Sequence, residues 1–593
     1  MSAEQTSMNQ LITDNIDIWT STVKTKSASG RGSSKKRELY GVKKLRELIL
    51  ELAVRGKLVP QDPTDEPASV LLERIAEEKA QLVKDKKIKK QKLFGEVRDE
   101  EALFELPLGW QWTRLSELSE IGPRNSDVED ESEASFVPMP MISTSYKGDH
   151  GSEVRSWKDI KKGYTHFRDG DIALAKITPC FENSKAAVFS DLKNGVGTGT
   201  TELHVARPIL GALEPLFVLL YLKAPMFLKV GETQMTGSAG QKRVPKDFFA
   251  GNPLPYPPLK EQHRIVAKVD ELMTLCDQLE QQTEASIEAH QVLVETLLAT
   301  LTNSQDATEL MANWARISEH FETLFTTEQS IEQLKQTILQ LAVMGKLVPQ
   351  DPNDEPAAKL LERIEEEKAQ LVKEKKIKKQ KALPLITEDE KPFELPKGWE
   401  WCRLGSLFSF LNGFAFKSDW FTEQGVKLLR NINIAHSETK WSDLACVSDE
   451  LAKEYEKFSL NAGDIVISLD RPIINTGLKY AVIEEADLPC LLLQRVAKFS
   501  SYCASVNSSY LSNWLESYLF ISSIDPGRSN GVPHISTKQL EMLPFPLPPK
   551  KQQIKTVSVV DEMIFLCDQL KQRLRDSQQT QLQLTDAIVE QAV

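Results

Sequence analysis

The sequence predicts an α+β fold: two globular α+β domains separated by long antiparallel coiled-coil helices, arranged with pseudo-two-fold symmetry and circularly closed. Three observations lead to this prediction. Residues 50–92 return at 339–381 with 36 of 43 positions identical. Two segments without glycine or proline, 260–303 and 550–593, each follow a region of mixed composition. The C-terminal and N-terminal pieces, laid end to end, nearly rebuild the central helical segment.

The repeat continues beyond this block. "FELPLGWQWTRL" from Phe104 returns as "FELPKGWEWCRL" from Phe393, and "LPYPPLKEQ" from Leu254 returns as "LPFPLPPKKQQ" from Leu543. Between these phrases the similarity fades for over 100 residues. A matching framework therefore surrounds two unlike interiors. One framework presenting two different readers is the simpler account, and drift in loops around a shared core is the alternative.

The repeated block predicts a helix with a basic end. Prolines 60, 63 and 67 prevent an earlier helix, and Asp65 or Glu66 is expected to cap the segment that follows, 68–92. An apolar stripe, glutamates in early turns and lysines in late ones favour a helix there. The lysine run has two interpretations, a solvated helix end or a surface that contacts phosphates or a partner.

The two segments without glycine or proline predict long helices. Apolar residues recur from Ile265 to Leu279 and from Val560 to Leu574 at alternating steps of three and four, which is a coiled-coil seam. The seams match in register, so we expect them to pack on one another. Cys276 and Cys567 occupy seam positions and are interpreted as small buried apolar residues.

The two interiors mix strand and helix patterns. "GDIALAKI" and "GDIVISL" predict strands after Gly-Asp turns, and "FVLLYLKAPMFLKV" and "SSYLSNWLESYLFISS" each predict a helix. The chain therefore divides into five predicted segments: a helical framework at 1–103, a first α+β domain at 104–258, a central helical framework at 259–392, a second α+β domain at 393–549 and a long helix at 550–593.

Charge and composition limit the function classes. The net charge of −12 lies in the helical parts, because 106–260 is net 0 and 395–550 is net −2. A basic surface on either α+β domain is therefore compatible with the acidic total. The chain lacks a signal-peptide pattern and a membrane-length apolar run, and its seven cysteines form no C-x-x-C pair. We expect reduced thiols and a cytoplasmic location.

Catalytic motifs are missing from the sequence. It has no phosphate-binding G-x-x-x-x-G-K-[ST], no Asn/Asp-Pro-Pro-aromatic tetrapeptide for base methylation and no H-E-x-x-H. With a doubled framework, this favours recognition over catalysis. Polar, glycine-containing stretches such as "GTGTTE" and "GSAGQKRVPKDFF" suit DNA contacts, although each is equally compatible with an ordinary surface loop.

Several phrases together carry a family resemblance. "LAVRGKLVPQD" and "LAVMGKLVPQD", "FELPxGWxW", "GSAGQKRVP" and "PLPYPPLKEQHRIV" resemble the specificity subunit of type I restriction–modification enzymes, closest to the enterobacterial type IB branch. The resemblance implies two target-recognition domains that read an asymmetric, bipartite double-stranded DNA site. It implies docking of two methyltransferase subunits and of restriction–translocase subunits, and no catalysis by this chain. S-adenosylmethionine, ATP and Mg²⁺ belong to those partners, and this chain is expected to hold no cofactor or metal.

Candidate DNA contacts follow from the polar stretches within the two domains. Arg and Lys suit guanine edges, and Asn and Gln suit adenine. Two alternatives stay open, a non-DNA coiled-coil scaffold with two protein-binding domains and a self-contained nucleic-acid-modifying enzyme. The candidates are Lys176, Thr178, Asn183, Lys185, Gln241, Lys242 and Arg243 in the first domain, and Arg471, Asn475, Lys479, Arg528, Asn530, His534 and Lys538 in the second.

Overall fold

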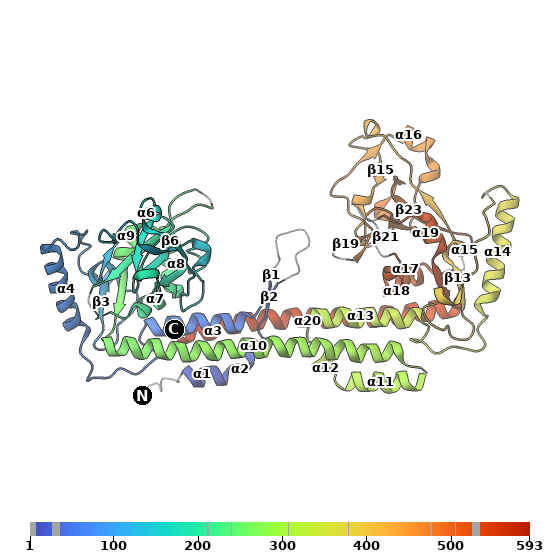
Figure 1. Cartoon of the computed structure of the whole chain (residues 1–593). Coiled ribbons are helices and arrows are strands. Elements are labelled where there is room, and N and C mark those ends of the chain that lie inside the picture. The colour runs from blue at the N-terminus through green and yellow to red at the C-terminus, as the bar shows by residue number, and fades with distance from the viewer. Residues whose placement is uncertain are drawn as a thin grey trace. The chain divides into compact units, whose positions relative to one another are not determined.

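The computed structural model (Figure 1) contains long helices and two sets of sheets, which confirms the predicted α+β class. It divides into two compact units, Met1–Ser286 with Ser577–Val593, and Ile287–Asp576. Each unit combines helices with one α+β domain. The boundaries of the five predicted segments stay a prediction. The structure describes residues 8–26, 36–209, 211, 213–238, 240–305, 307–377, 379–474, 477–503, 506–524 and 534–593.

Helix α3 (Tyr40–Val54) is the centre of the helical part of the first unit. Arg46 of α3 ion-pairs with Asp277 at 2.7 Å and Glu280 at 2.5 Å on α10 (Leu259–Asn303). On its other side, the Tyr40 hydroxyl donates to Asp586 of α20 (Lys550–Ala592) at 2.8 Å. The helices α1 (Met8–Asp14) and α2 (Ile16–Ser21) complete this part of the unit.

Helix α13 (Glu328–Val343) has the same place in the second unit. Its apolar face packs with Val560 and Cys567 of α20 and with Leu298 of α10 in one buried cluster. Lys335 contacts Asp568 at 2.5 Å, which repeats the pairing of Arg46 with Asp277. The unit also contains α11 (Ala307–Glu319) and α12 (Phe321–Leu324).

Each predicted seam therefore contacts the short helix of its own unit that leads into the repeated block, α3 or α13. Cys276 is fully buried beside Arg46 of α3, and Cys567 is 4% exposed beside Lys335 of α13. The two seams were expected to pack on one another. That expectation left out α3 and α13, whose own apolar faces also need burial. The prediction that both cysteines act as buried apolar residues agrees with their burial.

Two equivalent lysines relate the ends of α20 and α10. In the second unit, Lys346 Nζ donates to the carbonyls of Thr302 and Ser304, at 2.9 and 2.7 Å, where α10 ends. In the first unit, Lys57 Nζ donates to the carbonyl of Val593, directly after α20. The end of α20 thus takes the role in the first unit that the end of α10 takes in the second, as the predicted circular closure requires.

The helix of the repeated block is shorter than predicted. It spans α4 (Ala68–Lys84) in the first copy and α14 (Ala357–Lys373) in the second, so the lysine run from Lys86 lies beyond it. Lys86 has φ +57°, and the amides of Lys86 and Lys87 bond back to the carbonyls of Val83 and Leu82, which closes the helix. Asp65 does not cap α4, because it is buried against Arg264 at 2.8 Å.

The first α+β domain contains two four-stranded sheets. The sheet that positions the candidate site has the order β4-β11-β8-β9, with all neighbours antiparallel. The other has the order β6-β5-β10-β7 and one parallel pair, β5 with β10. The strands are β4 (Ser119–Ile121), β5 (Glu133–Val137), β6 (Glu153–Ser156), β7 (Thr165–Arg168), β8 (Ile172–Ala175), β9 (Ala186–Val188), β10 (Val196–Gly199) and β11 (Leu203–Pro208).

The second α+β domain repeats most of this plan in the same register, with one strand more in its first sheet and one fewer in its second. Ile172 pairs with Ala206 in the first domain, and Ile465 pairs with Phe499 at the equivalent place. The first sheet is β14-β23-β18-β21-β16, and the second is β17-β15-β22, with β15 parallel to β22. The strands are β14 (Phe408–Asn412), β15 (Val426–Leu429), β16 (His436–Ser437), β17 (Cys446–Val447), β18 (Ile465–Ser468), β21 (Tyr480–Val482), β22 (Cys490–Leu492) and β23 (Val496–Ser501).

Each domain is closed at its base by a strand pair carrying a buried arginine. Arg114 of β3 (Gln111–Arg114) donates to Glu101 at 3.0 Å, and β3 pairs with β12 (Pro253–Tyr256). Arg403 of β13 (Glu400–Arg403) donates to Glu390 at 2.7 Å, and β13 pairs with β24 (Pro544–Leu547). Both arginines also donate to backbone carbonyls, so this closure is the same in the two domains.

Two segments predicted as single helices are pairs of short helices. The first is α7 (Pro215–Lys223) followed by α8 (Pro225–Gln234), and the second is α17 (Ser508–Glu516) followed by α18 (Tyr518–Ser523). Pro225 begins α8 because it has no N–H to continue α7. The searched helices of the described ranges include none with the length and apolarity that crossing a bilayer would need.

Candidate nucleic-acid interface

The candidate site of each domain begins at a Gly-Asp turn before the central strand of the first sheet. Gly170 and Gly463 adopt φ +84° and +85°, a backbone region that glycine favours. The following aspartates, Asp171 and Asp464, each accept a 2.7 Å hydrogen bond from an amide three residues earlier. The two turns therefore have the same geometry, and each leads directly into its strand, β8 or β18.

The far ends of β8 and β18 are held by the same backbone bonds. In the first domain, the Lys176 amide donates to the Glu202 carbonyl at 2.9 Å, and the Val244 amide donates to the Lys176 carbonyl at 2.8 Å. In the second, the Leu469 amide donates to the Arg495 carbonyl at 2.8 Å, and the Ile535 amide donates to the Leu469 carbonyl at 3.0 Å.

One antiparallel bridge completes each of these junctions. It joins Ile177 to Arg243 in the first domain and Asp470 to His534 in the second. Ile177 and Asp470, Glu202 and Arg495, and Arg243 and His534 are thus equivalent positions. We call each set of three residues the strand-end junction of its domain.

The junction of the first domain is an arginine held by a glutamate. Arg243 donates from Nε and Nη2 to the two carboxylate oxygens of Glu202, both at 2.9 Å, and from Nη1 to the Gln241 carbonyl at 3.2 Å. The hydrogen bonds from Arg243 lower the pKa of Glu202 below its usual value. This bidentate pair orders the segment that carries Gln241 and Lys242.

The junction of the second domain has the opposite arrangement of charge. An aspartate, Asp470, replaces the isoleucine and is buried, and an arginine, Arg495, replaces the glutamate. Asp470 lies 2.9 Å from Arg495 Nη1 and 3.2 Å from His534 Nδ1. Arg495 is 63% exposed and has φ +70°, a region uncommon for residues other than glycine. A buried anion therefore holds an exposed cation.

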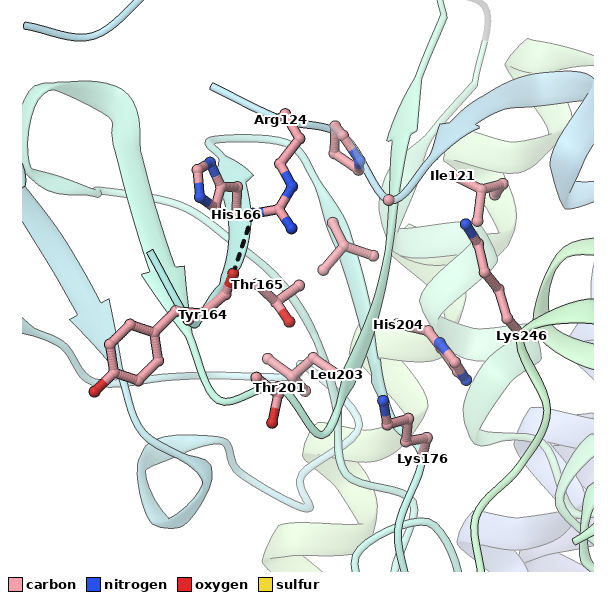
Figure 2. Close-up of a pocket in the computed structure, with 14 residues that line it drawn as sticks. Ile121, Arg124, Tyr164, Thr165, His166, Lys176, Thr201, Leu203, His204 and Lys246 are labelled. Atoms are coloured by element: carbon pink, nitrogen blue, oxygen red, sulfur yellow. Dashed lines mark hydrogen bonds between the residues drawn. The ribbon is translucent and has the colours of Figure 1, made fainter. Parts of the chain in front are cut away.

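A cleft of about 430 Å³ lies beside the junction of the first domain (Figure 2). Arg124, Lys176 and Lys246 line it together with His166 and His204. Burial, together with the positive field of the two lysines, lowers the pKa of His204 to about 4, so that ring is neutral at pH 7. Among the described residues that line the cleft there is no aspartate or glutamate, so its charge is positive.

The matching positions of the second domain carry no charge. By the shared strand pairings and backbone bonds, Lys176 corresponds to Leu469, Arg124 to Gly413 and Lys246 to Thr537. His204 corresponds to Ala497. Within the described residues, the three cations that line the cleft of the first domain therefore have no charged equivalent in the second.

The structure brings five of the seven predicted first-domain residues to one place. Lys176 is at the cleft, and Gln241, Lys242 and Arg243 lie on the segment paired with it. The Thr178 amide donates to the Lys242 carbonyl at 3.0 Å, which adds Thr178 to this group. The remaining two are in the turn toward β9, where Asn183 is exposed and Lys185 Nζ donates to the Met139 carbonyl at 3.0 Å.

The predicted residues of the second domain are less concentrated. Arg471 and His534 flank Asp470, whereas Lys479 is 9% exposed and donates to the backbone carbonyl of Asn431. Lys538 is exposed on α19 (Thr537–Met542). Asn475, Arg528 and Asn530 lie outside the described residues.

Sequence reasoning missed Arg124, Lys246 and Arg495. Arg124 and Lys246 come from segments about 120 residues apart, and no sequence signal joins them. Arg495 could have been found, because alignment of the two Gly-Asp strands places it on Glu202 of the "GTGTTE" stretch. A search of the described ranges for clusters of His, Cys, Asp and Glu that could hold a metal ion finds none.

Comparison with known proteins supplies the family. The model described as "Type I restriction modification DNA specificity domain" matches residues 107–289 and 396–577. The EcoAI specificity subunit of Escherichia coli is 64% identical, covering 99% of this chain and 100% of the relative. The EcoEI specificity subunit of Escherichia coli is 51% identical with the same coverage. The solved HsdS subunit of Thermoanaerobacter tengcongensis aligns with 83% of this chain and 98% of that chain, at 19% identity and a TM-score of 0.44.

Proposed function

The chain belongs to the family of type I restriction–modification DNA specificity subunits. From this premise we propose that its two α+β domains read the two halves of one bipartite, asymmetric DNA target. As a specificity subunit it recognises DNA and is not itself the catalyst. The first domain reads one half-site and the second domain reads the other, each through the surface around its strand-end junction.

One observation carries the proposal: the first sheets of the two domains share four strands in the same register, yet they have unlike side chains at equivalent positions. Arg243 with Glu202 in one domain corresponds to His534 with Arg495 in the other. Base edges are distinguished by the donors and acceptors presented to them, so different side chains select different bases. Two unlike junctions on one framework therefore favour two different half-sites.

The proposed partners follow from the family and from the doubled framework. Two methyltransferase subunits dock on this chain, and restriction–translocase subunits join them. S-adenosylmethionine, ATP and Mg²⁺ are carried by those partners, and this chain supplies sequence recognition alone. The equivalent contacts of α3 and α13, such as Arg46–Asp277 and Lys335–Asp568, support two equivalent docking surfaces.

The candidate DNA contacts are those predicted from the sequence, with Arg495 added. Exposed Gln241 and Lys242 on the ordered segment of the first domain, and exposed Arg471 and Arg495 in the second, are best placed to meet DNA. Arg243→Ala removes the group that orders Gln241 and Lys242. It is expected to relax or abolish reading of one half-site while the other half-site is read as before.

A domain exchange tests the proposal. Residues 104–258 are replaced by the aligned segment of a relative with a different target, and the chimera is co-expressed with its methyltransferase subunits. Mapping methylated adenines across the genome should show a target with one new half and one unchanged half. The reciprocal exchange of 393–549 is the matched control and should change only the other half.

Two outcomes contradict the proposal. If both halves of the methylated site change together in either chimera, the domains do not read separately. If neither half changes, although the donor segment specifies a different half-site in its own protein, the interiors do not carry specificity.

A further inference from the structure

We propose that the basic cleft of the first domain binds a phosphate group of the DNA backbone, so that this domain has an electrostatic anchor that the second domain lacks. The inference rests on the proposed function and deepens it, because it separates residues that hold the backbone from residues that read bases. It assigns Arg124, Lys176 and Lys246 to backbone binding.

The three cations reach the cleft from three separate segments. Arg124 follows β4, Lys176 follows β8, and Lys246 begins α9 (Lys246–Gly251). Figure 2 shows their side chains around one hollow, with His204 between Lys176 and Lys246 and with Thr165 and Thr201 on the side away from Lys246. Lys246 Nζ lies close to Gly122, because a Cβ atom built on that glycine would be 3.4 Å from it, which places the ammonium at the rim of the cleft.

The charge in the cleft is not compensated within the described part of the domain. Arg124 Nη1 donates only a long bond, 3.4 Å, to the Tyr164 carbonyl. Glu202, whose pKa the charge of Lys176 helps to lower, is already held through both oxygens by Arg243. The two histidines add no charge at neutral pH, because their pKa values are lowered by burial. An anion entering the cleft would therefore meet unpaired positive charge.

The chemistry of the lining favours a phosphate over a base edge. A lysine ammonium is a compact point charge that binds phosphate without needing a planar partner. Lys and Arg also suit guanine edges, but the described lining holds no Asn or Gln to read an adenine, and half or more of protein–DNA hydrogen bonds go to phosphate and sugar. Thr165 and Thr201 can donate to phosphate oxygens as well. The cleft adjoins the segment that carries Gln241 and Lys242, so a phosphate held there would fix the backbone next to the bases being read.

Salt dependence tests the assignment. The double variant Lys176→Gln/Lys246→Gln is assembled with the methyltransferase subunits, and its binding to the target duplex and to an unrelated duplex is measured by fluorescence anisotropy from 50 to 200 mM KCl. Each lost phosphate contact reduces the slope of log K against log salt by about 0.9. We expect the slope to fall by about 1 to 2, with both duplexes weakened by the same factor.

A matched control removes two other lysines from the same domain. Lys158 and Lys193 are exposed outside the cleft, beside Glu131 at 3.6 Å and Glu133 at 3.1 Å. The variant Lys158→Gln/Lys193→Gln should keep the parent slope, and thermal melts of both variants establish that they fold.

Three results have distinct meanings. An unchanged slope in the cleft variant overturns the phosphate assignment, and so does a loss confined to the target duplex, since that pattern marks base reading. An equal fall of slope in the control variant also overturns it, because the effect would then follow total charge. If the unmodified complex shows no preference for the target duplex, the proposed function fails instead.

Discussion

The strand-end junctions of the two domains have the same backbone and opposite side-chain chemistry. Equivalent amides bond to equivalent carbonyls within 0.2 Å of one another, at Lys176 and Leu469. Around this shared scaffold, a glutamate holds an arginine in the first domain, and an aspartate from a different position holds another arginine in the second. The difference shows that the junction tolerates a reversal of charge, because its geometry depends on backbone hydrogen bonds.

The same comparison separates two explanations of the repeat. Drift around a shared core would alter side chains without giving them new partners. In the second domain, however, Asp470 is buried and has Arg495, His534 and Asn431 within 3.3 Å. A buried carboxylate with three polar partners is a specific arrangement, because burying an unpaired carboxylate would cost free energy. The interiors have diverged into two organised surfaces, which favours two readers.

The largest effects should come from breaking what the two domains share. Arg114→Met and Arg403→Met each remove a buried arginine that satisfies a carboxylate and backbone carbonyls. A buried backbone carbonyl that loses its donor costs about 1 to 3 kcal/mol. Hydrogen–deuterium exchange should show accelerated exchange in the unit that carries the substitution. Effects of very different size in the two units would show that the closures are not equivalent.

The next effect should break what the domains do not share. Arg243→Ala and Arg495→Ala should each reduce discrimination at one half-site by about 1 to 3 kcal/mol, the value of a good base contact. Methylation of a target library with each half randomised in turn measures this. Asp470→Asn should weaken the same positions as Arg495→Ala, because Asp470 holds that guanidinium. An Arg495→Ala variant that loses discrimination at the half-site affected by Arg243→Ala would contradict the division of labour.

A smaller effect concerns pH. The folded protein binds the proton of His204 less tightly than the unfolded chain, since the pKa is about 4 against a usual value of about 6.5. The contribution of neutral His204 to the free energy of unfolding is therefore complete above about pH 6.5, and it is lost as the pH falls toward 4. The loss between pH 7 and pH 5 is about 2 kcal/mol.

Melting temperatures at the two pH values check this. In His204→Gln the drop between pH 7 and pH 5 should shrink, whereas His320→Gln, which changes an exposed ring of the second unit, should leave it unchanged. Ala497 stands at the equivalent place of the second domain, so that domain has no matching proton site. A drop of unaltered size in His204→Gln would show that the ring does not resist protonation in the folded state.

The smallest effect is expected at Glu51, where the repeated blocks differ and the second copy has Gln340. Burial raises the pKa of Glu51, so its charged form is disfavoured in the fold. Stability at this site falls as the pH rises above the usual glutamate pKa. Glu51→Gln should therefore raise the free energy of unfolding at pH 7 by less than about 1 kcal/mol, measured by urea denaturation. A clear destabilisation would mean that the pairing with Arg55 at 3.7 Å outweighs burial.

Much of the fold was predictable because it is periodic or repeated. The absence of glycine and proline predicted α10 and α20, and the Gly-Asp turns predicted β8 and β18. Errors occurred where one residue changes the backbone direction, as at Pro225 between α7 and α8 and at Lys86, whose positive φ ends α4 before the lysine run. Local propensity does not reveal which lysine turns the chain.

The candidate site was only partly predictable. The "GSAGQKRVP" stretch drew attention to Gln241, Lys242 and Arg243, and the structure places them on the segment paired with the end of β8. The sequence could not show that Glu202 would occupy the guanidinium of Arg243. That contact joins residues 41 positions apart, and it depends on the order of strands in the sheet.

The sequence by itself determined the doubled framework, the two unlike interiors and the family, because these are written in identities, periodicity and contiguous phrases. Tertiary structure alone decided that the unlike interiors share one sheet in one register, and that Arg124, Lys176 and Lys246 meet in one cleft of the first domain. Backbone hydrogen bonds preserve a fold while side chains change, so the two interiors share a fold with little sequence similarity. Charges gathered from distant segments act together only once the strands are paired.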